Sequence, residues 1–137
     1  MSKLERIFKQ GVELESKGRR EEALSKYKQG LKQEPSDREK MFVPMFHRHI
    51  AVIYEQMGEM LKAKRSHLNA LKYGRPNSYT YLWLGDLSVS RGELAAARRY
   101  FARCEEIATL EKDEDLLKLL AKRKISNRSK QRNRYEF

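Results

Sequence analysis

The chain has 137 residues, enough for one domain, of which 39% are hydrophobic and 36% charged. This composition suits thin helical layers better than a deep core, and no apolar run approaches the roughly 20 residues that a membrane span requires. The net charge is +11, but residues 118–137 alone carry eight basic side chains and one acidic one, which argues against the whole domain as a nucleic-acid binder.

The first elements in the chain are two helices separated by a turn. Apolar and small residues recur at helical spacing from Leu4 to Leu14, and again from Ala23 to Leu31. Gly18 lies between the two runs, where a turn needs a residue free to take a positive φ. Pro35 follows the second run and ends the helix, because proline cannot extend one.

This pair of helices recurs twice more along the chain. Each unit has a small residue, a glycine seven residues later, an alanine five residues further, a ring four residues after that, and a second small residue after three more. The positions are Gly11, Gly18, Ala23, Tyr27 and Gly30; Ala51, Gly58, Ala63, His67 and Ala70; and Gly85, Gly92, Ala97, Phe101 and Cys104. The third unit follows the second by 34 residues, whereas the second follows the first by 40. The six extra residues, 38–43, are expected to lengthen the next helix or to form a bent lead-in to Pro44.

A closing helix is expected over residues 113–125. Asp113 suits its N-cap, and Leu116, Leu119 and Leu120 line one face that would cover the end of a helical stack. Residues 126–137 have almost no apolar content, and we expect a basic disordered tail there.

The ordered series of small residue, glycine, alanine, ring and small residue resembles the tetratricopeptide-repeat family over most of the chain. The resemblance implies an all-α helical-hairpin solenoid of about seven helices. It places repeats at about 4–37, 44–77 and 78–111 within a domain spanning 1–125. His67 departs from the usual ring, and Ser88 stands where a larger residue is common.

The resemblance further implies that the first helix of each repeat lines a concave groove for a partner peptide or helix. It assigns to this groove Phe8, Val12, Met45, Arg48, His49, Val52, Tyr79, Leu82, Trp83 and Asp86. Arg48, His49, Tyr79 and Trp83 are expected to converge there. The expected function is therefore a non-enzymatic adaptor that binds a protein or peptide. The alternative is that the closing helix or a second copy of the chain covers these residues.

One branch of the family binds acidic chaperone C-termini through a clamp of lysine, asparagine and arginine side chains. The corresponding positions hold Phe8 and Val12, then His49, then Tyr79 and Trp83. A carboxylate would lack its charge-assisted partners here, so we do not expect a chaperone tail as the ligand.

The basic end of the chain supports a different class of function. Its cations could follow a phosphate backbone or an acidic protein surface: Lys122, Arg123, Lys124, Arg128, Lys130, Arg132 and Arg134. The alternative function is thus a ribonucleoprotein- or RNA-associated factor, and the simplest explanation of the tail is a solubilising segment.

Sequence signals for catalysis are absent. There is no Walker loop, GxGxxG, nucleophile elbow or HExxH, so we expect no enzymatic activity, cofactor or metal. His47 and His49 are two apart and would point in different directions on a helix, and Cys104 takes a small-residue position in a core. A single cysteine and the lack of an apolar signal core at the start favour a cytoplasmic protein without a membrane contact.

Overall fold

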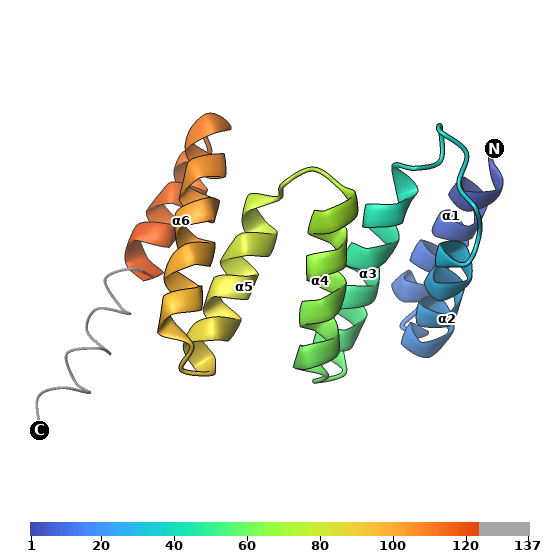
Figure 1. The fold of residues 1–137 in the computed structure, drawn as a ribbon. Helices are drawn as coiled ribbons and strands as arrows, with labels where there is room; N and C mark the ends of the chain where they lie inside the picture. The colour runs from blue at the N-terminus through green and yellow to red at the C-terminus, as the bar shows by residue number, and fades with distance from the viewer. Residues whose placement is uncertain (124–137) are drawn as a thin grey trace, which may run out of the picture. The chain divides into compact units, whose positions relative to one another are not determined.

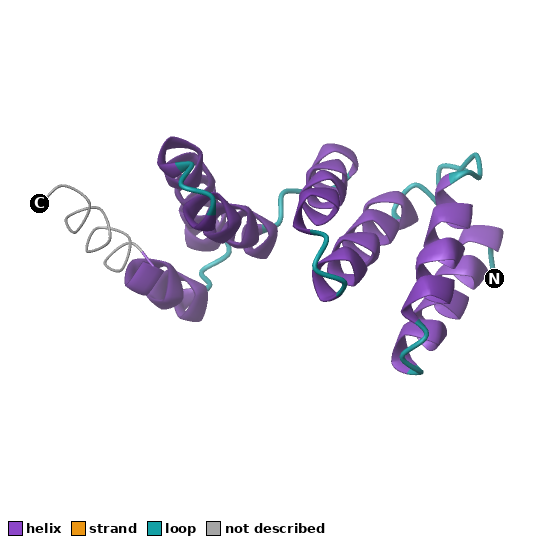
Figure 2. Cartoon of the chain, turned by 90° about the horizontal axis from the view of Figure 1, so that it is seen from below, coloured by secondary structure: helices purple, strands orange, loops and turns teal. Residues whose placement is uncertain are grey.

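The computed structural model describes residues 1–123, and these residues form helices and connecting loops without a strand (Figures 1 and 2). The chain divides into two compact units, Met1–Arg75 and a second unit that begins at Pro76. An all-α fold is therefore confirmed over the described part, while a single solenoid domain spanning 1–125 stays a prediction. Lys124 and residues 126–137, including the expected disordered tail, lie outside the described residues.

The first unit consists of two helical hairpins. Helices α1 (Lys3–Ser16) and α2 (Arg20–Leu31) form one hairpin, and α3 (Phe42–Gln56) and α4 (Met60–Tyr73) form the other. Helix α3 also packs against α2 and α1, which joins the hairpins. The core between them is made of apolar side chains and one buried tyrosine: Leu4, Ile7, Ala23, Tyr27, Phe46, Ile50 and Ile53.

The second unit has a hairpin of α5 (Ser78–Ser90) and α6 (Leu94–Leu110), followed by a helical segment over residues 114–123. Asp113 caps this last segment, because its carboxylate accepts a hydrogen bond from the Leu116 amide at 3.0 Å. Leu116 and Leu120 are buried in a core with Leu82, Ala97, Phe101, Cys104 and Ala108. The structure thus has a helix over residues 114–123 with one apolar face buried, while its role in closing a repeat stack stays a prediction.

Each hairpin turns at a glycine in the left-handed region. The φ angles are +74° at Gly18, +77° at Gly58 and +75° at Gly92. A side chain at such a φ is strained, so these positions require the residue that lacks Cβ. The turns expected from the repeat pattern are therefore confirmed in all three hairpins.

The repeat's small residue and ring touch each other inside a hairpin. A Cβ atom on Gly11 would lie 2.4 Å from the Tyr27 ring, and one on Gly85 would lie 2.4 Å from the Phe101 ring. A second close approach joins successive hairpins, where a Cβ atom on Gly30 would lie 2.6 Å from the Phe46 ring. The glycines therefore set how closely the helices approach.

The six extra residues, 38–43, form a turn followed by the start of α3, and one of them, Glu39, caps the first helix. Residues 36–41 lie in the connection, and α3 begins at Phe42, two residues before Pro44. The Glu39 carboxylate accepts hydrogen bonds from the amides of Leu4 (2.9 Å) and Ser36 (3.2 Å). The bond from Leu4, in the first turn of α1, and the bond from Ser36 lower the pKa of the Glu39 carboxyl. The insertion thus both bends the lead-in and lengthens α3, and it also stabilises the N-terminus of α1.

A first prediction concerns the contact between Gly11 and Tyr27. Gly11→Ala should lower the free energy of unfolding by about 1–3 kcal/mol, because the added methyl overlaps the ring. In the second repeat the same two positions hold Ala51 and the smaller ring of His67. Denaturant unfolding of Gly11→Ala, Tyr27→His and the double variant should show a double-variant loss smaller than the sum of the two. Strictly additive losses would mean that these positions do not limit the approach of the helices.

A second prediction concerns the cap supplied by Glu39. Glu39→Gln should lower the melting temperature at neutral pH, since the first turn of α1 loses a charged acceptor. Because folding lowers the Glu39 pKa, its contribution is present above the pKa of the unfolded chain and disappears as the pH falls through the folded value. Asp37→Asn is the matched control, because the Asp37 side chain is 94% exposed and makes an ion pair with Lys40 on the surface. Equal melting shifts in the two variants would exclude the cap.

Candidate partner-binding surface

The residues assigned to the groove in the first unit lie on α1 and α3, the first helices of their hairpins. Val12 and Val52 are 38% and 41% exposed, and Arg48 is also exposed. Phe8 and Met45 are half-buried. The Phe8 ring packs edge-on against the His49 ring, with 5.1 Å between centroids. The structure therefore brings Phe8 and His49 of the predicted set into contact, while a common surface for all of its α1 and α3 members stays a prediction.

A cluster of three polar side chains links α1 and α3 to α2. The Glu15 carboxylate on α1 accepts a hydrogen bond from Tyr27 on α2 and lies 2.8 Å from His49 Nδ1 on α3. Burial, together with the bond to Glu15, raises the pKa of the Tyr27 hydroxyl above its usual range. This shared carboxylate links the His49 ring on α3 to α1 and α2.

The second repeat contains a related polar pair. His67 on α4 lies 3.2 Å from the Glu55 carboxylate on α3, and these residues are twelve apart, as are Tyr27 and Glu15. Burial lowers the pKa of His67, and Glu55 opposes that shift only in part. The sequence pattern predicted the ring position of His67 but not its contact with Glu55. The recurring spacing of twelve between a first-helix glutamate and a second-helix ring was the available signal.

In the second unit the groove positions are engaged by the last helical segment. Leu82 is only 7% exposed and lies in the core with Leu116 and Leu120, so it contributes to packing rather than to an open surface. Asp86 pairs with Arg123 at 2.9 Å. The structure thus favours, for these two positions, the alternative in which the closing helix covers the predicted groove.

The two aromatic members of the second unit are placed differently. Tyr79 is 57% exposed, and its hydroxyl donates a hydrogen bond to Asp113 at 3.2 Å. Trp83 is half-buried. The predicted convergence of Tyr79 and Trp83 with Arg48 and His49 involves both units and stays a prediction.

The remaining candidate residues have local packing roles. His47 stacks on Tyr73 with 5.7 Å between centroids, away from the contacts of His49, and burial lowers its pKa. Cys104 is fully buried, and burial raises the pKa of its thiol. Within residues 1–123 no group of three histidine, cysteine or acidic side chains is arranged to hold a metal ion.

The basic cations of the chain's end divide between the last helical segment and the residues beyond it. Lys122 is exposed, whereas Arg123 makes the ion pair with Asp86. Lys124, Arg128, Lys130, Arg132 and Arg134 lie outside the described residues. Over the part that the structure describes, no helix is long and apolar enough to cross a membrane.

Comparison with known proteins adds no assignment. No model of a known protein family matches the chain, and no curated protein matches it.

A third prediction follows from the burial of His67. Because folding lowers its pKa below the ordinary value of 6.5, the unfolded chain binds the proton more readily. The free energy of unfolding should therefore decrease as the pH falls below about 6.5. His67→Gln should remove part of this decrease, and His47→Gln a further part, since burial also lowers the His47 pKa. Denaturant unfolding at a series of pH values measures the slopes. A His67→Gln slope equal to that of the unchanged protein would show that His67 is not desolvated on folding.

Proposed function

We propose that the chain is a non-enzymatic adaptor of the tetratricopeptide-repeat kind that binds a partner peptide or helix on the surface formed by α1 and α3. The observation that carries the proposal is the exposure of Val12 and Val52 at equivalent positions of two adjacent first helices. The Glu15–His49 contact ties α1 to α3. A surface of this kind holds apolar anchors on a rigid scaffold, which favours recognition of an apolar side chain.

The repeat architecture is supported by contacts that recur at the spacing of the sequence pattern. The turn glycines share one φ region, and the small residue faces the ring in both the first and the third hairpin. The carboxylate-to-ring contact recurs in the first and second hairpins. Such recurrence supports a series of equivalent helical hairpins, as in a helical-repeat protein.

The chemistry of the surface also restricts the ligand. Val12 and Val52 supply apolar area, and the exposed guanidinium of Arg48 lies one turn before Val52 on α3. Arg48 can bind a carboxylate or a backbone carbonyl of the ligand. A short segment with an apolar anchor and an acceptor near it therefore suits this surface.

A fourth prediction tests this surface. Val12→Asp combined with Val52→Asp should reduce capture of the bound partner by more than about tenfold, because two apolar anchors are replaced by charges that would have to be desolvated. Helicity and melting should change little, since both side chains are exposed. Affinity capture from cell extract, followed by binding measurements with the identified partner, gives the comparison.

The matched control is Met57→Asp combined with Met60→Asp. These methionines are each 40% exposed, so the change in charge and apolar area is similar, but they lie at the turn between α3 and α4. Capture that survives the valine substitutions, or that the methionine substitutions reduce equally, would contradict the proposed surface. Nuclease treatment is included because capture that requires RNA would instead favour the ribonucleoprotein function.

A further inference from the structure

A second surface, on α4, has a regular pattern that the proposed function does not use. Helix α4 buries Ala63, Ser66, His67 and Ala70 on one side and packs against α3. The other side carries Leu61, Arg65, Leu68 and Lys72, spaced by four, three and four residues. This spacing places them in one stripe along the helix. We call these four residues the α4 ridge.

The α4 ridge exposes two leucines one heptad apart. Leu61 is 60% exposed and Leu68 is 40% exposed. Single exposed leucines are common on protein surfaces and have no special meaning. Two of them at heptad spacing on one straight helix form the kind of seam that a second helix can pack against.

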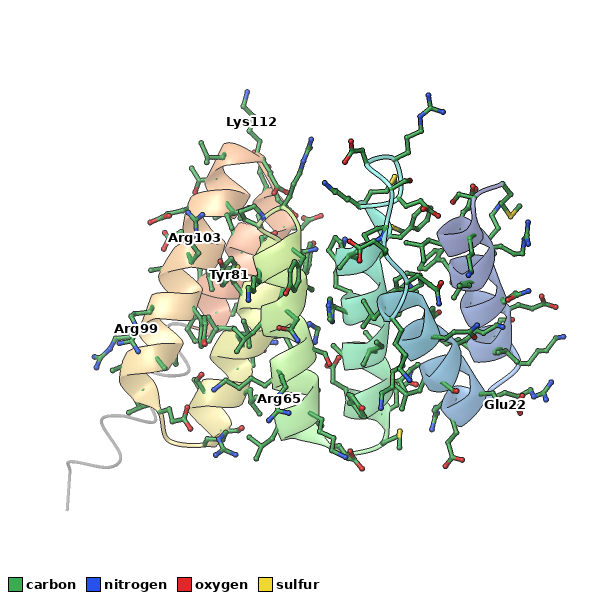
Figure 3. The ribbon with its side chains drawn as sticks, turned by 45° about the vertical axis from the view of Figure 1, so that its right-hand side comes forward. Glu22, Arg65, Tyr81, Arg99, Arg103 and Lys112 are labelled. Atoms are coloured by element: carbon green, nitrogen blue, oxygen red, sulfur yellow. The ribbon has the colours of Figure 1, made fainter. Side chains whose placement is uncertain are left out.

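The charged residues within α4, the helix that carries these leucines, are all basic. Helix α4 contains Lys62, Lys64, Arg65 and Lys72 and no acidic residue. Glu59, just before the helix, pairs with Lys62 at 3.0 Å. Within the described residues Arg65 and Lys72 have no carboxylate partner, and Lys72 lies over the Tyr73 ring at 5.3 Å. Arg65 is exposed and is one of the side chains labelled in Figure 3. Within residues 1–123, the two cations of the α4 ridge, Arg65 and Lys72, are therefore not neutralised by a carboxylate.

We propose that the α4 ridge docks an acidic amphipathic helix of a partner protein. The partner's leucine-like side chains would pack between Leu61 and Leu68, and its flanking glutamates or aspartates would pair with Arg65 and Lys72. Charge complementarity selects such a helix over a basic one, because like charges across an interface are strongly unfavourable. A nucleic acid would match the cations but would leave the two leucines against its phosphates, so the leucines favour a protein partner.

The experiment uses the full chain and a designed, fluorescently labelled peptide. The peptide has leucine at heptad spacing and glutamate at the flanking positions. Fluorescence anisotropy should show binding that weakens as salt is added, since part of the attraction is between charges. Leu61→Ala combined with Leu68→Ala should weaken binding by about tenfold or more, because the apolar contact is lost. Circular dichroism should show unchanged melting, because both side chains are exposed.

Charge exchange provides a positive control. The variant with Arg65→Glu and Lys72→Glu should no longer bind the glutamate peptide. It should instead bind a peptide in which each flanking glutamate is replaced by lysine. The Val12→Asp and Val52→Asp variant should still bind the glutamate peptide, so that failure here and failure of the α1 and α3 surface are distinguishable.

Four outcomes would overturn the proposal. The glutamate peptide could fail to bind at low salt, or could bind the leucine variant as tightly as the unchanged protein. A glutamate peptide without leucine could bind as tightly as the amphipathic one, which would reduce the ridge to a charged patch. A single-stranded RNA could bind through Arg65 and Lys72 while the peptide does not.

Discussion

Close contact between a glycine on one helix and an aromatic ring on the next is the constraint on which the first and third hairpins depend. Tyr27 and Phe101 are almost fully buried because Gly11 and Gly85 have no side chain where the rings lie. A thin layer of helices has little interior, so a large ring that reaches the facing backbone supplies much of its apolar contact. The positive φ at the turn glycine then brings the second helix back at the required angle.

The buried rings differ in how their polar atoms are satisfied. Tyr27 and His67 each reach a glutamate twelve residues earlier, on the first helix of the same hairpin. In the third hairpin the corresponding residues are Phe101 and Val89, which need no polar partner. A buried hydroxyl or imidazole without a partner is costly, so ring and carboxylate are expected to change together. The three hairpins therefore differ in pairs of residues: a polar ring occurs with a glutamate, and an apolar ring occurs with an apolar residue.

The local parts of the structure were predictable from the sequence, because each depends on residues close together in the chain. The turn glycines, the buried alanines and the Asp113 cap are of this kind. Long-range contacts were not predictable. Nothing near Glu39 in the sequence indicates that its carboxylate would cap a helix 35 residues earlier. Which first-helix residues stay open depends likewise on the helix packed beside them.

That dependence explains why exposed apolar area remains on α1 and α3 but not at Leu82. Coverage by a neighbouring helix is seen on α1 and on α5: His49 and Phe42 of α3 pack on Phe8, and Leu116 of the last helical segment packs near Leu82. The covered position in α1 is Phe8, which packs against α3 and lies four residues before Val12. Val12 itself is one turn further along, so it remains exposed, as does Val52. The binding surface proposed on α1 and α3 is therefore the part of these helices that their packing leaves uncovered, so its chemistry can vary without disturbing the core.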